Sequence, residues 1–599
     1  MTNNKLFRAV SATLAASLAV AALAPAAVAA PAMMDKKWEN KPQMPKQQEK
    51  TMQLTLLQMG DIHGHLIPRA HLRSDGNGAQ WGGLAYMYSK IQELRAKNPN
   101  TLLFNTGDTI QGSAEALYTK GQALVDVLDH FGIVGFAPGN WDYLYGAERF
   151  VELFGNGRWG GVAANVYYDP AVYPDKAGQT VLPPYRILNL NGLKIGLMGL
   201  STERITLAPG PFATAGFIAT SEGEEVPGIV DTLRNQEKVD LVIMVSEFGL
   251  AKNVQFGEKY AGIDVILSSD MHEETSREPV VTRNGTIVTE VGQDGTRLGQ
   301  IDLDIRNGKI ANWKYTFHTI DSSKIKPHPK IAALIKQKRR EFVAGRGFKA
   351  HINPFNGMVL KTPIDTVVGK AEVPLYRANF SDENMPGAVE GTSHDFIADA
   401  FRDQAGADIG HMRGFRYGTH VAPGDIKLED LYHYIAIGPQ VAKTTITGQM
   451  LKDDLENNAD GSFNPDTFKW TGGWQQALSG VKYDLDLYAS KGNRVQNVQI
   501  LNRTTGQWEA LDAAKSYTYA GYWYDQAPKK VGALISSNPV TPVKGAKGEV
   551  LDGTAVVVNY LKTHTANPEQ NRIRLLNPLP APVYGNPEIQ PLQGVSTAY

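Results

Sequence analysis

The sequence predicts an α/β protein in which a layered-sheet domain precedes a second, smaller α/β domain. Between residues 53 and 317, short apolar runs alternate with amphipathic helical segments such as 84–97 and 121–131. These runs are apolar on both faces, which is typical of strands buried between layers. The predicted buried strands are residues 54–59, 101–105, 195–200, 241–245 and 265–267. In such a fold, the loops at the strand ends carry the chemistry.

The domain organisation follows from a change of pattern after residue 320. Residues 324–342 are basic and amphipathic, so we expect a linker helix within 321–361. Longer strands, such as 495–501 and 517–524, then predict a second α/β domain over 362–577, after a first domain over 52–320. Residues 578–599 contain five prolines and are expected to form a tail.

The N-terminus has the pattern of a signal peptide over residues 1–30. Lys5 and Arg8 precede an Ala-rich apolar run, and Ala27-Val28-Ala29 offers small residues for cleavage. The run is short for a membrane span and is followed by Pro25. Without a twin-arginine pair, the sequence predicts export to the periplasm by the general secretory route. Residues 31–51, rich in Lys, Gln, Pro and Met, predict a disordered leader.

The composition excludes several classes of function. The 599 residues include 60 basic and 61 acidic ones, giving a net charge of −1. No global field would hold nucleic acid or an anionic membrane, so we expect neither as a partner. The chain has no cysteine, which excludes disulfides, thiolate metal sites and cysteine nucleophiles. Any metal must be bound by His, Asp, Glu, Asn and water.

Polar residues cluster at the ends of four of these strands and of a further strand that ends at Pro138-Gly139. Residues i and i+2 of an extended segment point the same way, so Asp61 and His63 can face one metal together. Each cluster alone could be a loop with a capping side chain. Five of them would converge on one rim of a sheet, which a two-metal hydrolytic site explains. The clusters are Asp61-Ile62-His63, Gly107-Asp108, Gly139-Asn140-Trp141-Asp142, Ser246-Glu247 and Ser269-Asp270-Met271-His272.

The order of these motifs resembles the 5′-nucleotidase family of calcineurin-like metallophosphoesterases. Trp81-Gly82-Gly83 and Ala164-Asn165-Val166 match accessory positions of the first domain, and Gly414–Gly418 with Pro423-Gly424-Asp425-Ile426 match the C-terminal domain. The resemblance implies a four-layer β-sandwich flanked by helices, followed by a substrate-binding domain. It also implies two divalent cations, which we expect to be Mn²⁺.

The resemblance assigns a ligand to each strand end. Metal one would be bound by Asp61, His63, Asp108 and His272, and metal two by Asp108 as a bridge, Asn140 and two positions that are normally histidines. Those two positions are Glu247 and Asp270 in this chain. Four carboxylates against two divalent cations give a formal charge near zero, and oxygen-rich sites favour Mn²⁺, Mg²⁺ or Ca²⁺ over Zn²⁺. The alternative is a decayed site that no longer binds two metals.

A second departure concerns acid catalysis. Nucleotidases of the family read Gly-Asn-His-Glu, but this chain has Trp141 in place of the usual His, so no catalytic side chain is assigned beyond metal-activated water. Loss of such a helper typically costs about 10²–10⁴ in rate. The Trp-acidic-aromatic run Trp141-Asp142-Tyr143 is similar to the SoxB thiosulfohydrolases, which are periplasmic dimanganese enzymes. These act on a cysteine-S-thiosulfonate of a carrier protein.

Arg416 is the predicted substrate-binding residue, together with its neighbours Phe415 and Tyr417. An arginine between aromatics in a loop after a glycine is suited to bidentate binding of an oxyanion. The sequence thus predicts an exported two-metal hydrolase of a sulfonate or carrier-bound thiosulfonate. The alternatives are a 5′-nucleotidase acting on a small anionic substrate with the same metals, and a catalytically decayed binding protein on the same fold.

Overall fold

The computed structural model describes most of the chain from residue 51 to residue 577. The described residues are 51–72, 78–210, 213–376, 389–413, 420–464, 466–471, 475–569 and 571–577. The predicted signal peptide, almost all of the leader and the Pro-rich tail lie outside these ranges. Within them, no helix combines the length and the apolar character needed to cross a membrane.

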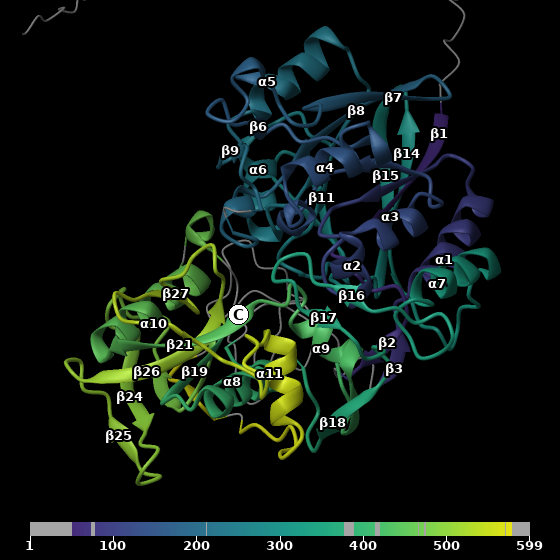
Figure 1. Ribbon diagram of the computed structural model, residues 1–599. Coiled ribbons are helices and arrows are strands. Elements are labelled where there is room, and N and C mark those ends of the chain that lie inside the picture. The colour runs from purple at the N-terminus through teal and green to yellow at the C-terminus, as the bar shows by residue number, and fades with distance from the viewer. Residues whose placement is uncertain are drawn as a thin grey trace, which may run out of the picture. The chain divides into compact units, whose positions relative to one another are not determined.

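Two sheets form the centre of the first domain (Figure 1). The first has the order β15-β14-β1-β4-β5 and comprises β1 (Thr51–Met59), β4 (Thr101–Asn105), β5 (Ile133–Phe136), β14 (Arg297–Arg306) and β15 (Lys309–Thr319). The second has the order β12-β13-β11-β10-β8-β7 and comprises β7 (Tyr185–Leu190), β8 (Leu193–Leu200), β10 (Leu241–Ser246), β11 (Val265–Ser268), β12 (Val280–Val281) and β13 (Ile287–Glu290). The predicted buried strands are confirmed as β1, β4, β8, β10 and β11.

The two sheets pack face to face, because alternate side chains of their strands share one apolar cluster. Leu54 and Leu56 of β1 lie there with Phe104 of β4 and with Leu197 of β8 and Ile243 of β10. Helices cover the outer faces. The first sheet is covered by α1 (Leu84–Lys97), α3 (Gln122–Leu128), α4 (Ala147–Phe154) and α7 (Pro329–Arg339), and the second by α5 (Val226–Asp231) and α6 (Leu250–Lys259). The predicted four-layer arrangement is therefore confirmed.

The predicted linker helix corresponds to α7, which is shorter than the segment 321–361. Its Ile331 and Ile335 are buried in the same cluster as α1 and α3. The helix begins at Pro329, where the missing N–H costs no helical hydrogen bond. Between α7 and residue 361, the structure has turns and the short strands β16 (His351–Ile352) and β17 (Val359–Leu360).

The second domain contains a mixed sheet around β26. Strand β19 (Ile409–Met412) runs parallel to β26 (Ser516–Trp523), which pairs antiparallel with β21 (Gln440–Thr447) (Figure 1). The predicted strand 517–524 is thus β26, and 495–501 is β24 (Val495–Leu501). The main helices of this domain are α8 (Thr392–Ala405), α9 (Leu428–Tyr434), α10 (Gly448–Phe463) and α11 (Gly553–Tyr560). Together they confirm the smaller α/β domain.

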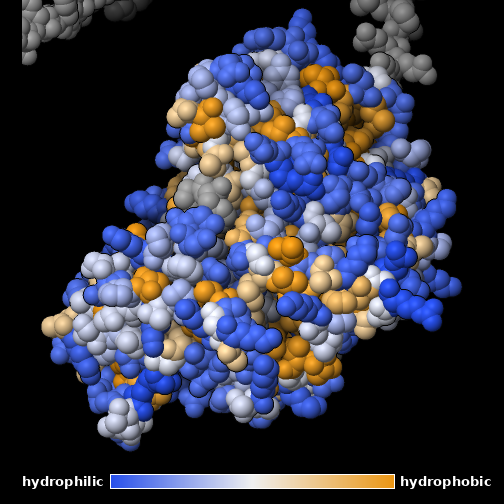
Figure 2. All heavy atoms as spheres, viewed as in Figure 1, coloured by the Kyte–Doolittle hydropathy of each residue, from blue (hydrophilic) through white to orange (hydrophobic). Residues whose placement is uncertain are grey.

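The surface facing the viewer in Figure 2 is mainly hydrophilic, and its apolar residues lie in separate small groups. The large apolar side chains that are most exposed come from scattered positions. They include Ile352 of β16, Ile535 and Tyr488, each more than 60% exposed. Single exposed apolar residues of this kind are normal on protein surfaces.

Candidate metal centre

The loops after parallel neighbouring strands bring the polar strand ends together. In the first sheet, β1 pairs in parallel with β4, and β4 with β5, so Asp61, Asp108 and Asn140 follow adjacent strands. In the second sheet, β10 lies between β8 and β11, so Glu247 and Asp270 follow neighbouring strands. Carboxyl ends of parallel strands meet at one edge of a sheet. The arrangement explains how residues about 200 positions apart in the chain become neighbours.

The first group of donors consists of Asp61, His63 and His272. The Nε2 atoms of the two histidines lie 3.0 Å apart, and Asp61 Oδ1 lies 3.6 Å from His63 Nε2 and 3.3 Å from His272 Nε2. All three side chains are buried, and Asp61 Oδ1 accepts no hydrogen bond from any described residue. A carboxylate oxygen that accepts no hydrogen bond and faces two imidazole nitrogens is a donor set suited to a divalent cation.

The second group consists of Asp61, Asp108 and Glu247, whose candidate ligand atoms lie within 4.8 Å of one another. Asp108 Oδ1 accepts a hydrogen bond from the Trp141 backbone N–H (2.8 Å), which leaves Oδ2 3.8 Å from His63 Nε2. Glu247 Oε1 accepts from the Ser269 hydroxyl (2.8 Å), while Oε2 has no hydrogen-bond partner among the described residues. Because Asp61 belongs to both groups, the residues present fit two neighbouring cation positions.

The remaining two predicted ligands, Asn140 and Asp270, lie beside these groups. Asp270 forms a close ion pair with the buried Arg204, and its backbone N–H donates to Asp61 Oδ2 (3.2 Å). In the amide orientation that satisfies its neighbours, the Asn140 nitrogen lies 3.3 Å from Asp270 Oδ1 and its oxygen 2.9 Å from the Trp141 indole nitrogen. Asp270 is outside both three-residue donor groups.

The backbone at the candidate ligands is strained. Asp61 (φ 46°), His63 (φ 43°), Asp108 (φ 45°), Asp270 (φ 93°) and His272 (φ 61°) all adopt the left-handed region. Residues other than glycine rarely do so, and such strain concentrates at functional sites because the surrounding structure must hold it. The sequence gives no sign of these conformations, because none of the five residues is glycine.

Burial and mutual repulsion shift the pKa values of the carboxyl groups. Burial, together with the negative charges of Asp61 and Asp270, raises the pKa of Asp108 well above its usual value, although His63 opposes the shift. Burial, Asp108 and Asp61 likewise raise the pKa of Glu247. Burial also raises the pKa of Asp61, but the nearby charges of His272 and His63 outweigh it and lower that pKa overall. A cation bound here would stabilise the ionised forms of these carboxylates.

Trp141 is buried and packs in an apolar cluster with Leu144 and Leu117. The adjacent Asp142 accepts hydrogen bonds from the backbone N–H groups of Thr109 (2.9 Å), Ile110 (3.2 Å) and Gly139 (3.0 Å). Asp142 therefore fixes the loop that carries Asp108. The predicted substrate-binding residues Phe415, Arg416 and Tyr417 lie outside the described residues.

Two residues at this site were not predicted from the sequence. Gln111 accepts from His63 Nδ1–H (3.1 Å), which directs His63 Nε2 toward the donor group. Arg204 follows β8 directly, in the segment Ser201-Thr202-Glu203-Arg204. This segment is a sixth polar strand end, and its position after a buried strand is the signal that could have identified it.

Two family models match the chain. The calcineurin-like phosphoesterase model matches residues 54–274, and the 5′-nucleotidase C-terminal domain model matches residues 367–535. The chain therefore combines a calcineurin-like phosphoesterase domain with a 5′-nucleotidase C-terminal domain. With a phosphoesterase domain that carries the clustered donors, it is a metal-dependent hydrolase. The metallophosphoesterase fold implies two divalent cations.

Individual relatives are distant. The chain is 22% identical to endonuclease YhcR of Bacillus subtilis, over 87% of this chain and 41% of YhcR, and thus spans less than half of that relative. It is 23% identical to the NAD 5′-nucleotidase of Haemophilus influenzae, over 79% of this chain and 84% of that protein. The solved structure of sulfate thiohydrolase SoxB of Thermus thermophilus superposes with a TM-score of 0.72 at 20% identity, covering 87% of this chain and 96% of SoxB. The SoxB similarity is one of fold.

Proposed function

We propose that this chain is an exported hydrolase that uses divalent cations, preferably Mn²⁺, to cleave a sulfonate or thiosulfonate ester, including one carried on a protein. The observation that carries the proposal is the pair of donor groups sharing Asp61. Asp61 Oδ1 and Glu247 Oε2 are both buried without a hydrogen-bond partner among the described residues. When bound, divalent cations polarise an ester oxygen and lower the pKa of water.

The side chains of the site have distinct roles in this proposal. Asp61, His63, Asp108, Glu247 and His272 would bind the cations. Gln111 holds the His63 ring in the tautomer that presents Nε2, and the Trp141 backbone N–H orients Asp108. Arg416 with Phe415 and Tyr417 would bind the anionic end of the substrate.

The replacement of a histidine by Trp141 favours the sulfonate over a phosphate monoester. A tryptophan indole cannot transfer a proton at neutral pH, so an ester whose leaving group needs protonation would react slowly. Attack of water on the sulfonate sulfur of a cysteine-S-thiosulfonate would form the new S–O bond of sulfate and break the S–S bond, so that the leaving group is a persulfide anion of the carrier. A persulfide anion is less basic than an alkoxide and needs less protonic assistance. The buried position of Trp141, next to Asp108, is consistent with this role.

The 5′-nucleotidase function is the second candidate. It is favoured by the similarity to the NAD 5′-nucleotidase of Haemophilus influenzae, which extends over 84% of that protein. The two candidates predict different products from the same purified Mn²⁺-loaded chain. Release of sulfate from a thiosulfonate-loaded carrier peptide supports the first, and release of phosphate from AMP or NAD supports the second.

The metal content of the purified chain distinguishes both hydrolase candidates from a catalytically decayed binding protein. Elemental analysis of the purified chain should find at least one tightly bound cation per chain, whereas a decayed site would retain less than one. Export is tested separately, because cleavage near Ala29 would give a periplasmic protein with a shortened N-terminus in mass spectrometry.

A further inference from the structure

Arg204 and Asp270 form a buried ion pair at the edge of the candidate metal centre. Their side chains are 7% and 4% exposed, and the guanidinium Nη2 donates to Asp270 Oδ2. Arg204 also lies near the Thr202 hydroxyl and the Thr471 carbonyl oxygen, each at 3.4 Å. The pair connects the loop after β8 to the loop after β11, over the end of β10.

The two oxygens of Asp270 are already engaged by the protein. Oδ2 accepts from Arg204, and Oδ1 faces the Asn140 amide nitrogen at 3.3 Å. A guanidinium does not lose its proton in proteins, so the positive charge of the buried Arg204 is compensated by the carboxylate that it contacts, Asp270. Removing Asp270 from Arg204 to bind a metal would leave a buried charge unpaired, which is costly. Asp61 Oδ1 and Glu247 Oε2 make no hydrogen bond with the described residues, so metal binding would break none.

We infer that Asp270 is the counter-ion of Arg204 and is not a metal ligand, so that the carboxylate and imidazole ligands of the cations are Asp61, His63, Asp108, Glu247 and His272. The inference rests on the proposed metal-dependent function and assigns its ligand set. Both groups of clustered donors are built from these five residues. Asp270 and Arg204 instead form part of the wall of the centre.

The pair also changes the charge of the centre. Four carboxylates and two divalent cations balance to zero, so the guanidinium of Arg204 leaves one net positive charge. This charge is fixed in place, because Arg204 is held by Asp270 and buried. A positive centre attracts an anionic sulfonate or phosphate better than a neutral one does. The positive charge of Arg204 thereby offsets the negative charge of Asp270, which stands where a histidine is usual.

The test measures Mn²⁺ binding to the full purified chain, by elemental analysis and by calorimetric titration. The double variant Arg204→Gln/Asp270→Asn replaces the ion pair by a neutral pair of similar shape. It should keep the Mn²⁺ content of the unmodified chain and an affinity within about threefold. Glu247→Gln should lose at least one equivalent of Mn²⁺ or bind it at least tenfold more weakly. Arg204→Gln alone leaves an additional negative charge and should bind Mn²⁺ more tightly.

Lys252→Met is the matched control. It removes another buried cation, which pairs with Glu203 (2.6 Å), the neighbour of Arg204, and its Mn²⁺ content should not change. Circular dichroism and thermal melting verify that each variant folds. If the folded double variant loses Mn²⁺ as Glu247→Gln does, Asp270 is a ligand and the inference is overturned, although the metal-dependent function stands. An unmodified chain that binds no Mn²⁺ would overturn both.

Discussion

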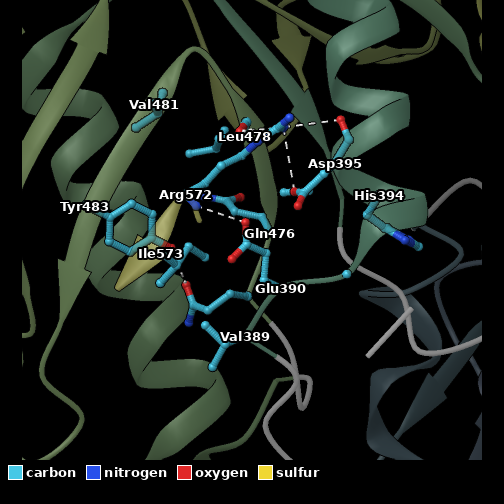
Figure 3. A pocket seen from close by; sticks show the side chains of 13 residues that line it. Val389, Glu390, His394, Asp395, Gln476, Leu478, Val481, Tyr483, Arg572 and Ile573 are labelled. Carbon is cyan, nitrogen blue, oxygen red and sulfur yellow. Dashed lines mark hydrogen bonds and ion pairs between the residues drawn. The ribbon is translucent and has the colours of Figure 1, made fainter. Parts of the chain in front are cut away.

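Two groups of largely buried carboxylates, each with one arginine, lie in different domains of this chain. The group in the second domain surrounds Arg572, whose guanidinium donates to the backbone oxygens of Asp395 and Leu478 (3.2 Å each) (Figure 3). The guanidinium also donates to both oxygens of Asp399 (2.8 and 2.7 Å). The Arg572 backbone N–H donates to Glu390 Oε1 (3.0 Å). A cavity of about 20 Å³ beside these residues is large enough for a water molecule.

The two groups differ in donors and in backbone strain. Among the described residues, the sets of His, Asp and Glu that could hold a metal all lie in the first domain, around Asp61. Glu390, Asp395, Asp399 and Arg572 are not among the residues in the left-handed region, whereas five candidate ligands of the first domain are. Buried carboxylates with an arginine are thus not sufficient to indicate a metal site. Clustered His and carboxylate donors on backbone in the left-handed region are the more specific sign.

The largest expected effect is the loss of the residue shared by both donor groups. Asp61→Asn should lower kcat/KM by about 10³-fold or more, because transition-state stabilisation by the cations amounts to several kcal/mol. The bound Mn²⁺ should fall in parallel, measured by elemental analysis. Asp399→Asn in the second domain is the comparison, and it should keep the metal. Equal metal content in the two variants would contradict the distinction between the carboxylates around Asp61 and those around Arg572.

The carboxylates around Arg572 in the second domain should contribute to stability and not to metal binding. Arg572→Met leaves buried carboxylates without their cation and should lower the free energy of unfolding by about 3–5 kcal/mol, measured by denaturant titration. Arg574→Met is the control, since Arg574 is 70% exposed and solvent screens its pair with Asp484, so the stability of this variant should be close to that of the unmodified chain. If Arg572→Met is as stable as Arg574→Met but loses Mn²⁺, the roles assigned to the two groups are reversed.

A smaller effect is expected at the residue that orients His63. Gln111→Ala removes the acceptor of His63 Nδ1–H and should weaken Mn²⁺ binding by about 10–100-fold, measured by titration calorimetry. Gln111→Glu keeps an acceptor and should restore most of the affinity. Unchanged binding in Gln111→Ala would show that the ring is oriented by packing alone.

The smallest effect concerns His411, which lies near the cavity of the second domain. Burial lowers the pKa of His411 to about 4, although the hydrogen bond to Gln476 opposes this shift. The unfolded chain takes up the proton near pH 6.5, so this contribution is fully present above pH 6.5 and decreases as the pH falls toward 4. The expected loss is roughly 1–2 kcal/mol, measured by unfolding at pH 7 and pH 5.

His411→Asn should reduce this pH dependence, whereas replacement of the exposed His564 should leave it unchanged. The slope between pH 7 and pH 5 is therefore compared among the three proteins. An unaltered slope in His411→Asn would assign the acid sensitivity to other groups.

The strand ends could be predicted from the sequence, but the contacts between their polar side chains could not. Hydrophobic runs predicted β1, β4, β8, β10 and β11, and the polar residues after four of them lie at one edge, as expected. It did not predict Arg204, because an ion pair between positions 66 apart leaves no periodic signal. The linker helix was predicted, but too long, because the amphipathic pattern continues after α7 has ended at Arg339.

The sequence by itself determined the two α/β domains, the family and the set of donors at the strand ends, because these depend on local pattern and residue type. Only the tertiary structure decided which carboxylates face one another and which faces an arginine. The side-by-side order of β8, β10 and β11 places Arg204 within reach of Asp270, while Glu247, from the strand between them, faces Asp61 and Asp108. Whether a carboxylate faces other carboxylates or an arginine thus depends on contacts between residues that are far apart in the sequence.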